Sequence, residues 1–289
     1  MKRLIILAAT LILLLVAIQP SLLAQDLAHP QDDRRYNQLI IDILKLALSK
    51  TAPDTHLVGV DSTLNRLVLQ IENGQLNIFW TGATKEYQNT LQAIKIPILK
   101  GLLGYRIFII RQGEQKRFDS VLNLEDLKRL YAGQVDTWGD TSVLLENNIP
   151  LVTTNKFDNL FSMLSGKRFD YLPRAIYEPW IEIDDYSKQD LTVEKNILLV
   201  YPFAMYFFVS KDNLKLAELI EEGFNIAIDD GSYDKLFFNN RIIKDSLAKA
   251  KLAGRKIFYL KNSNMPEDSP LDVAKYWIDV EKLSKKEND

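Results

Sequence analysis

The chain of 289 residues is long enough for one large domain or two of ordinary size, each with its own hydrophobic core. Hydrophobic residues at 47% and charged residues at 26% are ordinary globular values, which exclude a disordered or collagen-like chain. The 36 basic and 38 acidic residues give a net charge of -2, which argues against nucleic acid as a partner. With no cysteine and two histidines, the chain is expected to work through oxygen, amide, aromatic and guanidinium groups, without a metal or a cofactor.

The order of residue types at the N-terminus is typical of a secretory signal peptide. Lys2 and Arg3 precede an apolar run over residues 4–18, and a segment of mostly small residues ends at Ala24. A retained membrane anchor is the alternative, but the run is short for a bilayer span of ~20 residues. We therefore expect cleavage after Ala24 and a periplasmic protein.

The next segments have the pattern of an α/β unit. Apolar residues at three-and-four spacing predict a helix over residues 36–47, then a strand at 56–60, a helix at 64–71 and a strand at 76–80. Strand, helix and strand in about 25 residues imply a parallel crossover, so the loop after Trp80 should lie at the ligand-binding edge of a sheet. Trp80, Thr81 and Thr84 are therefore candidate binding residues, although a tryptophan at a strand end is more often part of the core.

The pattern continues with a polar helix over residues 84–92, extended runs at 94–99 and 105–111, and a helix start at Asn123. A short strand at 135–138 precedes a helix that Asp140 and Thr141 can cap. A strand at 151–153, a helix at 157–164 and a strand at 170–172 follow, and Pro173 suits the first turn of another helix. The apolar run 197–209 reads as one strand returning through the core, and helices are expected from residue 213 to the end.

These elements predict two lobes, the second inserted into the first. After the signal peptide at residues 1–24, residues 25–110 and 204–289 would form lobe 1 and residues 111–203 lobe 2. The crossings are expected near residues 109–113 and 200–205, where extended runs separate the two patterns.

Three segments resemble the extracytoplasmic solute-binding proteins of ABC importers, in the class that contains amino-acid binders. They are IPILKGLLGYR at residues 96–106, LNLEDL at 122–127 and GKRFDY at 166–171. The resemblance implies a type 2 periplasmic-binding-protein fold, with mostly parallel sheets flanked by helices, two chain crossings and hinge closure around a solute. It also implies a monomer whose partner is a membrane permease or a sensor.

The sequence departs from the amino-acid binders at both groups that hold a ligand zwitterion. Near Lys85, where the family carries an arginine for the ligand carboxylate, this chain has none. Where the family carries an acid for the ammonium group, the chain has a segment containing Arg174. This predicts an anionic ligand, a carboxylate, phosphate or sulfonate, that Arg174 would recognise; the alternative is that Arg174 pairs with Glu178.

Other candidates remain open between binding and packing. Trp138 could stack on a ligand whose anionic group meets the amides near Asp140 and Thr141, unless the Asp140 carboxylate competes for them. Tyr105 and Arg106 lie near an expected crossing, where a role in the cleft and plain packing are equally plausible. The binding candidates are thus Trp80, Thr81, Thr84, Tyr105, Arg106, Trp138, Thr141, Arg174 and Glu178.

The predicted function is capture of a small polar, anionic solute for transport. A sensing or accessory envelope protein is the first alternative. A dehydratase-like enzyme on the same fold is the second, with Glu178, Glu182 and Lys156 in the cleft. His29 and His56 are not expected to bind a metal; His29 is placed in a disordered N-terminal arm.

Overall fold

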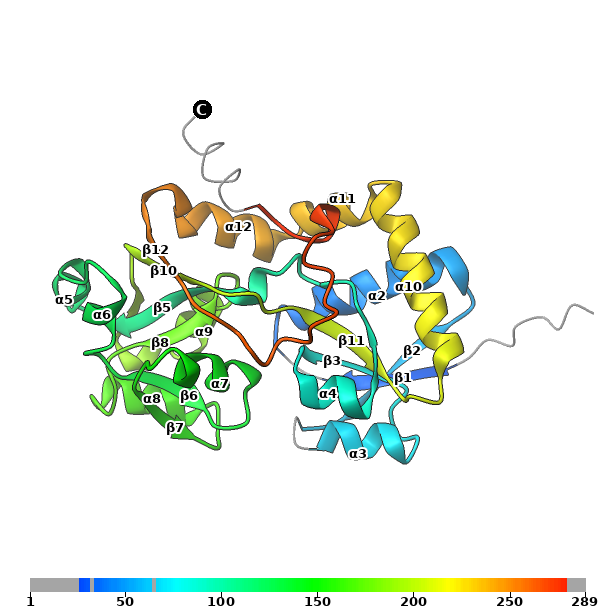
Figure 1. The fold of residues 1–289 in the computed structure, drawn as a ribbon, viewed down its shortest axis with the longest axis horizontal. Helices are drawn as coiled ribbons and strands as arrows, with labels where there is room; N and C mark the ends of the chain where they lie inside the picture. Colours follow the sequence, from blue (N-terminus) through cyan, green and yellow to red (C-terminus); the bar gives the residue numbers. More distant parts are fainter. Residues whose placement is uncertain (1–25, 32–33, 64–65, 280–289) are drawn as a thin grey trace, which may run out of the picture.

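The chain forms two α/β lobes that lie side by side (Figure 1). The computed structural model describes residues 26–31, 34–63 and 66–279. The predicted signal peptide lies outside these residues. No helix within the described ranges has the length and hydropathy needed to cross a membrane.

Lobe 1, on the right of Figure 1, is built on strands from both halves of the chain. The strands are β1 (Asp26–Gln31), β2 (His56–Asp61), β3 (Ile78–Gly82), β4 (Gln92–Ile94) and β11 (Met205–Val209). β1 runs parallel to β2, whereas β11 lies between β3 and β4, antiparallel to both. A 2.9 Å hydrogen bond from the amide of Asn77 to the carbonyl of Ala28 joins β1 to the start of β3.

The helices of lobe 1 pack their apolar faces against these strands and one another. They are α2 (Asn37–Thr51), α3 (Leu67–Glu72), α4 (Lys85–Thr90), α10 (Leu214–Asp229) and α11 (Ser232–Asn239). The α2 helix forms where the apolar spacing predicts it, and it packs along α10. This contact needs glycine at 223, because a Cβ there would lie 2.1 Å from the carbonyl oxygen of Ala47.

Lobe 2 combines two sheets with shorter helices. Its strands are β5 (Tyr105–Arg111), β6 (Ala132–Val135), β7 (Leu151–Thr154), β8 (Leu172–Ala175), β9 (Leu191–Val193), β10 (Ile197–Val200) and β12 (Lys256–Tyr259). Its helices are α5 (Gln115–Asp119), α6 (Leu124–Leu127), α7 (Gly139–Glu146), α8 (Asn159–Ser165) and α9 (Pro179–Asp185). Short 3-10 turns are η2 (Leu102–Gly104), η3 (Ser187–Gln189), η4 (Leu252–Gly254) and η5 (Ala274–Tyr276), and α12 (Arg241–Ala250) leads into β12.

The strand directions are more mixed than the resemblance implies. Only β1–β2, β6–β7 and β10–β12 pair in parallel as named strands in the described ranges, whereas β5 is antiparallel to β8, β9 and β10. The reason is that β5 and β11 enter their sheets directly from the connection between the lobes, so they run against the strands that follow helical crossovers.

The lobe boundaries also differ from the expected ones. The expected boundary after residue 110 would leave β5 in lobe 1, but β5 pairs with β8, β9 and β10, so the first crossing lies before Tyr105. The second crossing, residues 201–204, separates β10 from β11 within the run that the pattern reads as one strand. The two connections touch at Gly104, where a Cβ would lie 2.0 Å from the carbonyl oxygen of Tyr201.

A third connection runs along the C-terminal segment, which we call the strap (residues 256–279). It begins with β12, parallel to β10 in lobe 2, and then returns across the molecule to lobe 1 (Figure 1, orange to red). Between the lobes, the Ser263 amide donates to a Glu146 carboxylate oxygen of α7 at 2.9 Å. The Lys85 amide, at the start of α4, donates to the carbonyl of Asn264 at 3.0 Å. The strap therefore binds both lobes, which the prediction of C-terminal helices in lobe 1 misses.

Two local predictions are wrong for identifiable reasons. His29 lies in β1 with 6% of its surface exposed, because residues 26–31 pair with β2 instead of forming a disordered arm. Pro173 lies within β8, opposite Phe108 of β5, and the following helix begins at Pro179 instead. The proline rule for helix starts is correct here, but it applies to the second proline.

Candidate functional site

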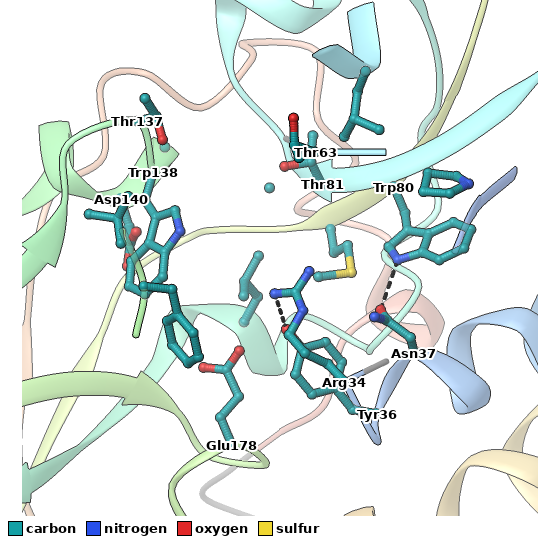
Figure 2. A pocket seen from close by; sticks show the side chains of 18 of the residues that line it. Arg34, Tyr36, Asn37, Thr63, Trp80, Thr81, Thr137, Trp138, Asp140 and Glu178 are labelled. Carbon is teal, nitrogen blue, oxygen red and sulfur yellow. Dashed lines mark hydrogen bonds between the residues drawn. The ribbon is translucent and has the colours of Figure 1, made fainter. Parts of the chain in front are cut away.

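A cavity of about 470 Å³ lies between the lobes and draws its walls from both of them. Lobe 1 contributes Trp80 and Thr81 of β3, together with Arg34 and Asn37 near the start of α2. Lobe 2 contributes Trp138 and Asp140 at the start of α7, Phe157 before α8, and Arg174 and Glu178 around the end of β8. Figure 2 shows Trp80 and Trp138 on opposite sides of this interlobe cavity.

The aromatic walls are held in place by polar contacts. The indole nitrogen of Trp80 donates to the side-chain oxygen of Asn37 at 3.1 Å, so the ring is fixed against α2. Trp138 lies beside Phe157, with ring centroids 6.0 Å apart. Both rings are partly buried and belong to lobe 2, and with their planes tilted by 44° they form one aromatic wall of the cavity.

Six of the nine predicted binding residues line the interlobe cavity, and three do not. Trp80, Thr81, Arg106, Trp138, Arg174 and Glu178 line it. Thr84 caps α4 by accepting from the Tyr87 amide at 3.2 Å, and the hydroxyl of Thr141 donates to the carbonyl of Val135 at 2.7 Å. The Tyr105 hydroxyl donates to the carbonyl of Ile278 at 3.4 Å. These three side chains hold the frame around the cavity.

Arg174 lies on β8 and its guanidinium is enclosed by acids and aromatic rings. It bonds Glu182 through two nitrogens, with Nε 2.8 Å from Oε2 and Nη2 2.5 Å from Oε1, and Nη2 lies 3.0 Å from Oε2 of Glu178. The guanidinium carbon lies 4.6 Å from the ring centre of Trp138 and 5.4 Å from that of Phe157. Arg174 of β8 thus does pair with Glu178, the residue before α9, as the alternative prediction has it. Its closer partner, however, is Glu182 within α9.

A second buried pair joins β5 to the start of α7. Nη2 of Arg106 lies 2.8 Å from Oδ2 of Asp140, and its Nε donates to the hydroxyl of Tyr201 at 2.9 Å. That hydroxyl donates in turn to Asp140 at 3.1 Å. Nη1 of Arg106 lies 3.7 Å from Oε2 of Glu178, which connects the two pairs into one network.

The Asp140 carboxylate therefore faces Arg106 and Tyr201. It makes no capping hydrogen bond to α7, although capping is what its sequence position suggests. Like Arg106, Asp140 is 2% exposed, so both charges lie away from bulk water. Neutralising the buried charge of Arg106 stabilises the folded protein more than a side-chain cap at the start of α7 would.

Burial and charge act together on the ionisation of this network. Burial by itself would lower the pKa of Arg106, but Asp140 and Glu178 outweigh it and raise that pKa above its usual value. The same balance, with Glu178 and Glu182 as partners, raises the pKa of Arg174. Burial, and then the neighbouring Glu178, raise the pKa of Glu182 in spite of the opposing effect of Arg174.

Several residues at the cavity have no sequence signal that marks them. Arg34 points into the cavity and donates to the Tyr36 hydroxyl (Figure 2), but it precedes the first predicted helix. Thr63, Thr137 and Asn155 lie in short loops whose composition resembles any turn. Only their position after strands of the two lobes could have indicated them.

Other residues stand near Lys85, where the amino-acid binders carry the arginine for the ligand carboxylate. Tyr87 lines the cavity, whereas Lys85 pairs with Glu267 of the strap at 3.1 Å. Of the residues considered for a dehydratase-like reaction, Glu178 and Glu182 meet on Arg174, but Lys156 is not part of the cavity lining. Within the part of the chain that the structure describes, no group of three or more acids and histidines is arranged to hold a metal ion.

Comparison with known proteins identifies the fold. No family model and no curated protein matches the chain. Among solved structures, the VFT2 domain of Bordetella pertussis BvgS (double mutant) has a TM-score of 0.60 at 15% identity, covering 77% of this chain and 92% of that one. An ancestral arginine-binding protein bound to arginine has a TM-score of 0.53 at 16% identity, with 74% and 96% covered.

A histidine kinase sensor domain with similarity to periplasmic binding proteins has a TM-score of 0.54 at 13% identity and covers 74% of this chain and 93% of that one. At these identities the likeness concerns architecture. The chain has the two-lobed fold of the periplasmic binding proteins, as the resemblance implies.

Proposed function

We propose that this chain is an extracytoplasmic binding protein that holds a small polar solute between its lobes. The observation that carries the proposal is the interlobe cavity, whose aromatic and polar side chains come from both lobes. A solute that touches both walls stabilises the arrangement in which the lobes are close, which is how binding is coupled to domain closure.

Contacts between the lobes surround the cavity and support this reading. Gly139, at the start of α7, lies so near lobe 1 that a Cβ there would be 2.9 Å from Cγ2 of Thr84 and 3.2 Å from the ring of Phe203. On the other side, Arg35 forms an ion pair with Asp185. A bound solute would stabilise these contacts, and a partner protein could recognise the closed arrangement of the lobes.

The geometry of Arg174 favours pairing over recognition of an anion. Glu178 and Glu182 already occupy its guanidinium, so an anionic ligand would have to compete with two carboxylates in a buried site. The proposed solute is therefore assigned as small and polar.

Transport and sensing are two uses of the same binding event. In the first, a membrane permease would accept the loaded protein; in the second, a receptor or another envelope protein would. The likeness to a histidine kinase sensor domain supports keeping sensing as the second candidate. Pull-down of envelope proteins with and without solute separates the two.

The test of solute binding is a thermal-shift screen of residues 25–289 against amino acids, dicarboxylates, sugars, nucleosides, phosphorylated compounds and polyamines. A ligand at 100 times its dissociation constant stabilises the folded state by about 2.7 kcal/mol, which corresponds to a rise of about 5–10 °C in a protein of this size. Trp138→Ala should abolish the shift, whereas Tyr259→Ala, at a residue 65% exposed on β12, should keep it. No shift with any class would refute the proposal.

A further inference from the structure

The charges around the interlobe cavity balance one another. The charged groups that line it are Arg34, Arg106, Arg174, Asp140 and Glu178, and Glu182 lies on Arg174. The lining itself thus carries three guanidinium groups and two carboxylates, and the six side chains together, with Glu182 bonded to Arg174 from outside the lining, have a net charge of zero. A solute with a net charge gains no attraction from the sum of these groups.

The balance is also local, because the two guanidinium groups on β5 and β8 each have a carboxylate at bonding distance. Arg106 and Asp140 are 2.8 Å apart, and Arg174 lies 3.0 Å from Glu178 and closer still to Glu182. All five of these side chains are less than 10% exposed. A ligand carboxylate or ammonium group that took one partner would leave the other buried without its counter-charge, which is strongly unfavourable.

The same network keeps both donors and acceptors for a ligand. The hydrogen bonds and ion pairs that the structure gives Glu178 use Oε2, and those of Asp140 use Oδ2. Arg174 uses Nε and Nη2. Figure 2 shows the Glu178 carboxylate turned toward the cavity. Hydroxyl groups suit such a wall, because each can donate to a carboxylate oxygen and accept from a guanidinium.

The remaining walls fit a ring with apolar faces. Trp138 and Phe157, whose ring planes are tilted by 44°, form an aromatic wall in lobe 2. Trp80 lies across the cavity from Trp138, on the lobe 1 side (Figure 2). The hydroxyls of Thr63, Thr81 and Thr137 add neutral polar groups to the lining, with Thr63 and Thr81 on the lobe 1 side. Stacking on aromatic faces combined with hydrogen bonding at the rim matches a ring that carries hydroxyl groups.

We infer that the ligand of this cavity is an uncharged ring compound bearing several hydroxyl groups, such as a monosaccharide or a nucleoside. This inference rests on the proposed solute-binding function and narrows its ligand class. It replaces the anionic ligand expected from Arg174, and it predicts that free amino acids, whose ionic groups would compete with the paired carboxylates and guanidinium groups, bind more weakly than the neutral ring.

The test compares compounds that share a shape and differ in charge. Neutral hexoses are titrated against their uronic acids and amino sugars, and nucleosides against their monophosphates, by calorimetry at pH 7, with amino acids as a further set. At least one neutral compound should bind, and its acidic and basic counterparts should bind at least tenfold more weakly. Binding by the sugar set or by the nucleoside set decides the source of the ring.

The outcomes separate this inference from the proposed function. If a charged compound or an amino acid binds as well as or better than every neutral ring, the inference is wrong while solute binding stands. If none of the compounds binds, the inference is wrong, and the broader thermal-shift screen decides whether solute binding stands.

A charge change in the cleft gives a second test. Glu178→Gln keeps the shape and the hydrogen bond from the Ala175 amide but adds one net positive charge. The preference for the neutral sugar over its uronic acid should fall at least tenfold, whereas Glu125→Gln, whose side chain is 76% exposed on α6, should leave it unchanged. If Glu178→Gln does not fold, Asp140→Asn makes the same change in charge. An unchanged preference in the folded variant overturns the inference.

Discussion

Replacing Arg174 by methionine should destabilise the protein strongly at neutral pH. The residue is 3% exposed, and its removal leaves Glu182, 6% exposed, without its bonded counter-charge. Glu178, 4% exposed, keeps the guanidinium of Arg106 at 3.7 Å but loses its nearer partner. Breaking a buried ion pair on one side costs about 3–5 kcal/mol. Neutralising one carboxylate at pH 7 from an ordinary pKa costs about 3–4 kcal/mol, so protonation limits the loss to this range.

The loss should shrink as the pH falls. The folded-state pKa of Glu182 is already raised, first by burial, and removing Arg174 takes away the group that opposes this. A carboxyl group with a raised folded-state pKa favours the folded state below its unfolded pKa and loses that contribution as the pH rises through the folded value. Arg174→Met should therefore be closest to the unsubstituted protein near pH 4–5 and furthest from it at pH 7 and above.

Urea unfolding followed by circular dichroism at several pH values measures both effects. The double variant Arg174→Met with Glu182→Leu should recover most of the stability, since apolar groups of similar volume can replace a buried pair. Arg117→Met, at a side chain 46% exposed, should change it by about 0.5 kcal/mol or less. A loss below about 1 kcal/mol for Arg174→Met at pH 7, or a loss independent of pH, would show that water reaches the pair and refute the reasoning.

Three further predictions concern the lobes and their connections. Gly139→Val should hold the lobes apart, because its side chain would overlap Thr84, and small-angle scattering should show a larger radius of gyration; an unchanged radius would mean that the lobes do not close on this residue. The strap should loosen in acid, because hydrogen bonds from Ser263 lower the pKa of Glu146 and their stabilisation is lost as the pH falls through that value. The protection of the amides of residues 261–264, which is the exchange rate of an unstructured chain divided by the measured rate at the same pH, should fall in acid and in Glu146→Gln at pH 7. Equal protection in all three would contradict this. Gly101→Ala should cost about 1–3 kcal/mol in urea unfolding, because φ at 101 is 77° and a Cβ would lie 2.4 Å from the ring of Trp277. A neutral effect would show that this connection accommodates a side chain.

The sequence predicts a helix or strand well where neighbouring residues in the chain determine it, and poorly where pairing with a distant segment does. The spacing of apolar residues gives α2, and the polar helix predicted over residues 84–92 forms as α4, with Thr84 as its cap instead of the predicted binding residue. β1 could not be recognised, because its six residues are held by pairing with β2 and have no apolar alternation of their own. Likewise β5 begins directly after the first connection, and the extended runs at residues 94–99 and 105–111 are both apolar, so their composition does not show that the boundary between the lobes lies between them.

The candidate site shows the same division. The edge rule for α/β sheets finds Trp80 and Thr81, since it depends only on the order of strands and helices. The role of Arg174 depends on Glu182, eight residues away in the chain, and on the strand pairing that sets its direction. Asp140 meets Arg106 from another element of lobe 2, which no spacing in the sequence encodes.

The strap changes the mechanics of the hinge. Two adjacent connections, at residues 101–104 and 201–204, define an axis about which two bodies can both bend and twist. The hydrogen bonds of residues 263 and 264 to Glu146 and Lys85 make a third attachment point away from those connections. Three points that do not share a line fix an orientation, so the lobes cannot rotate freely without breaking one of these bonds. The last part of the chain thereby limits how far the cavity can open.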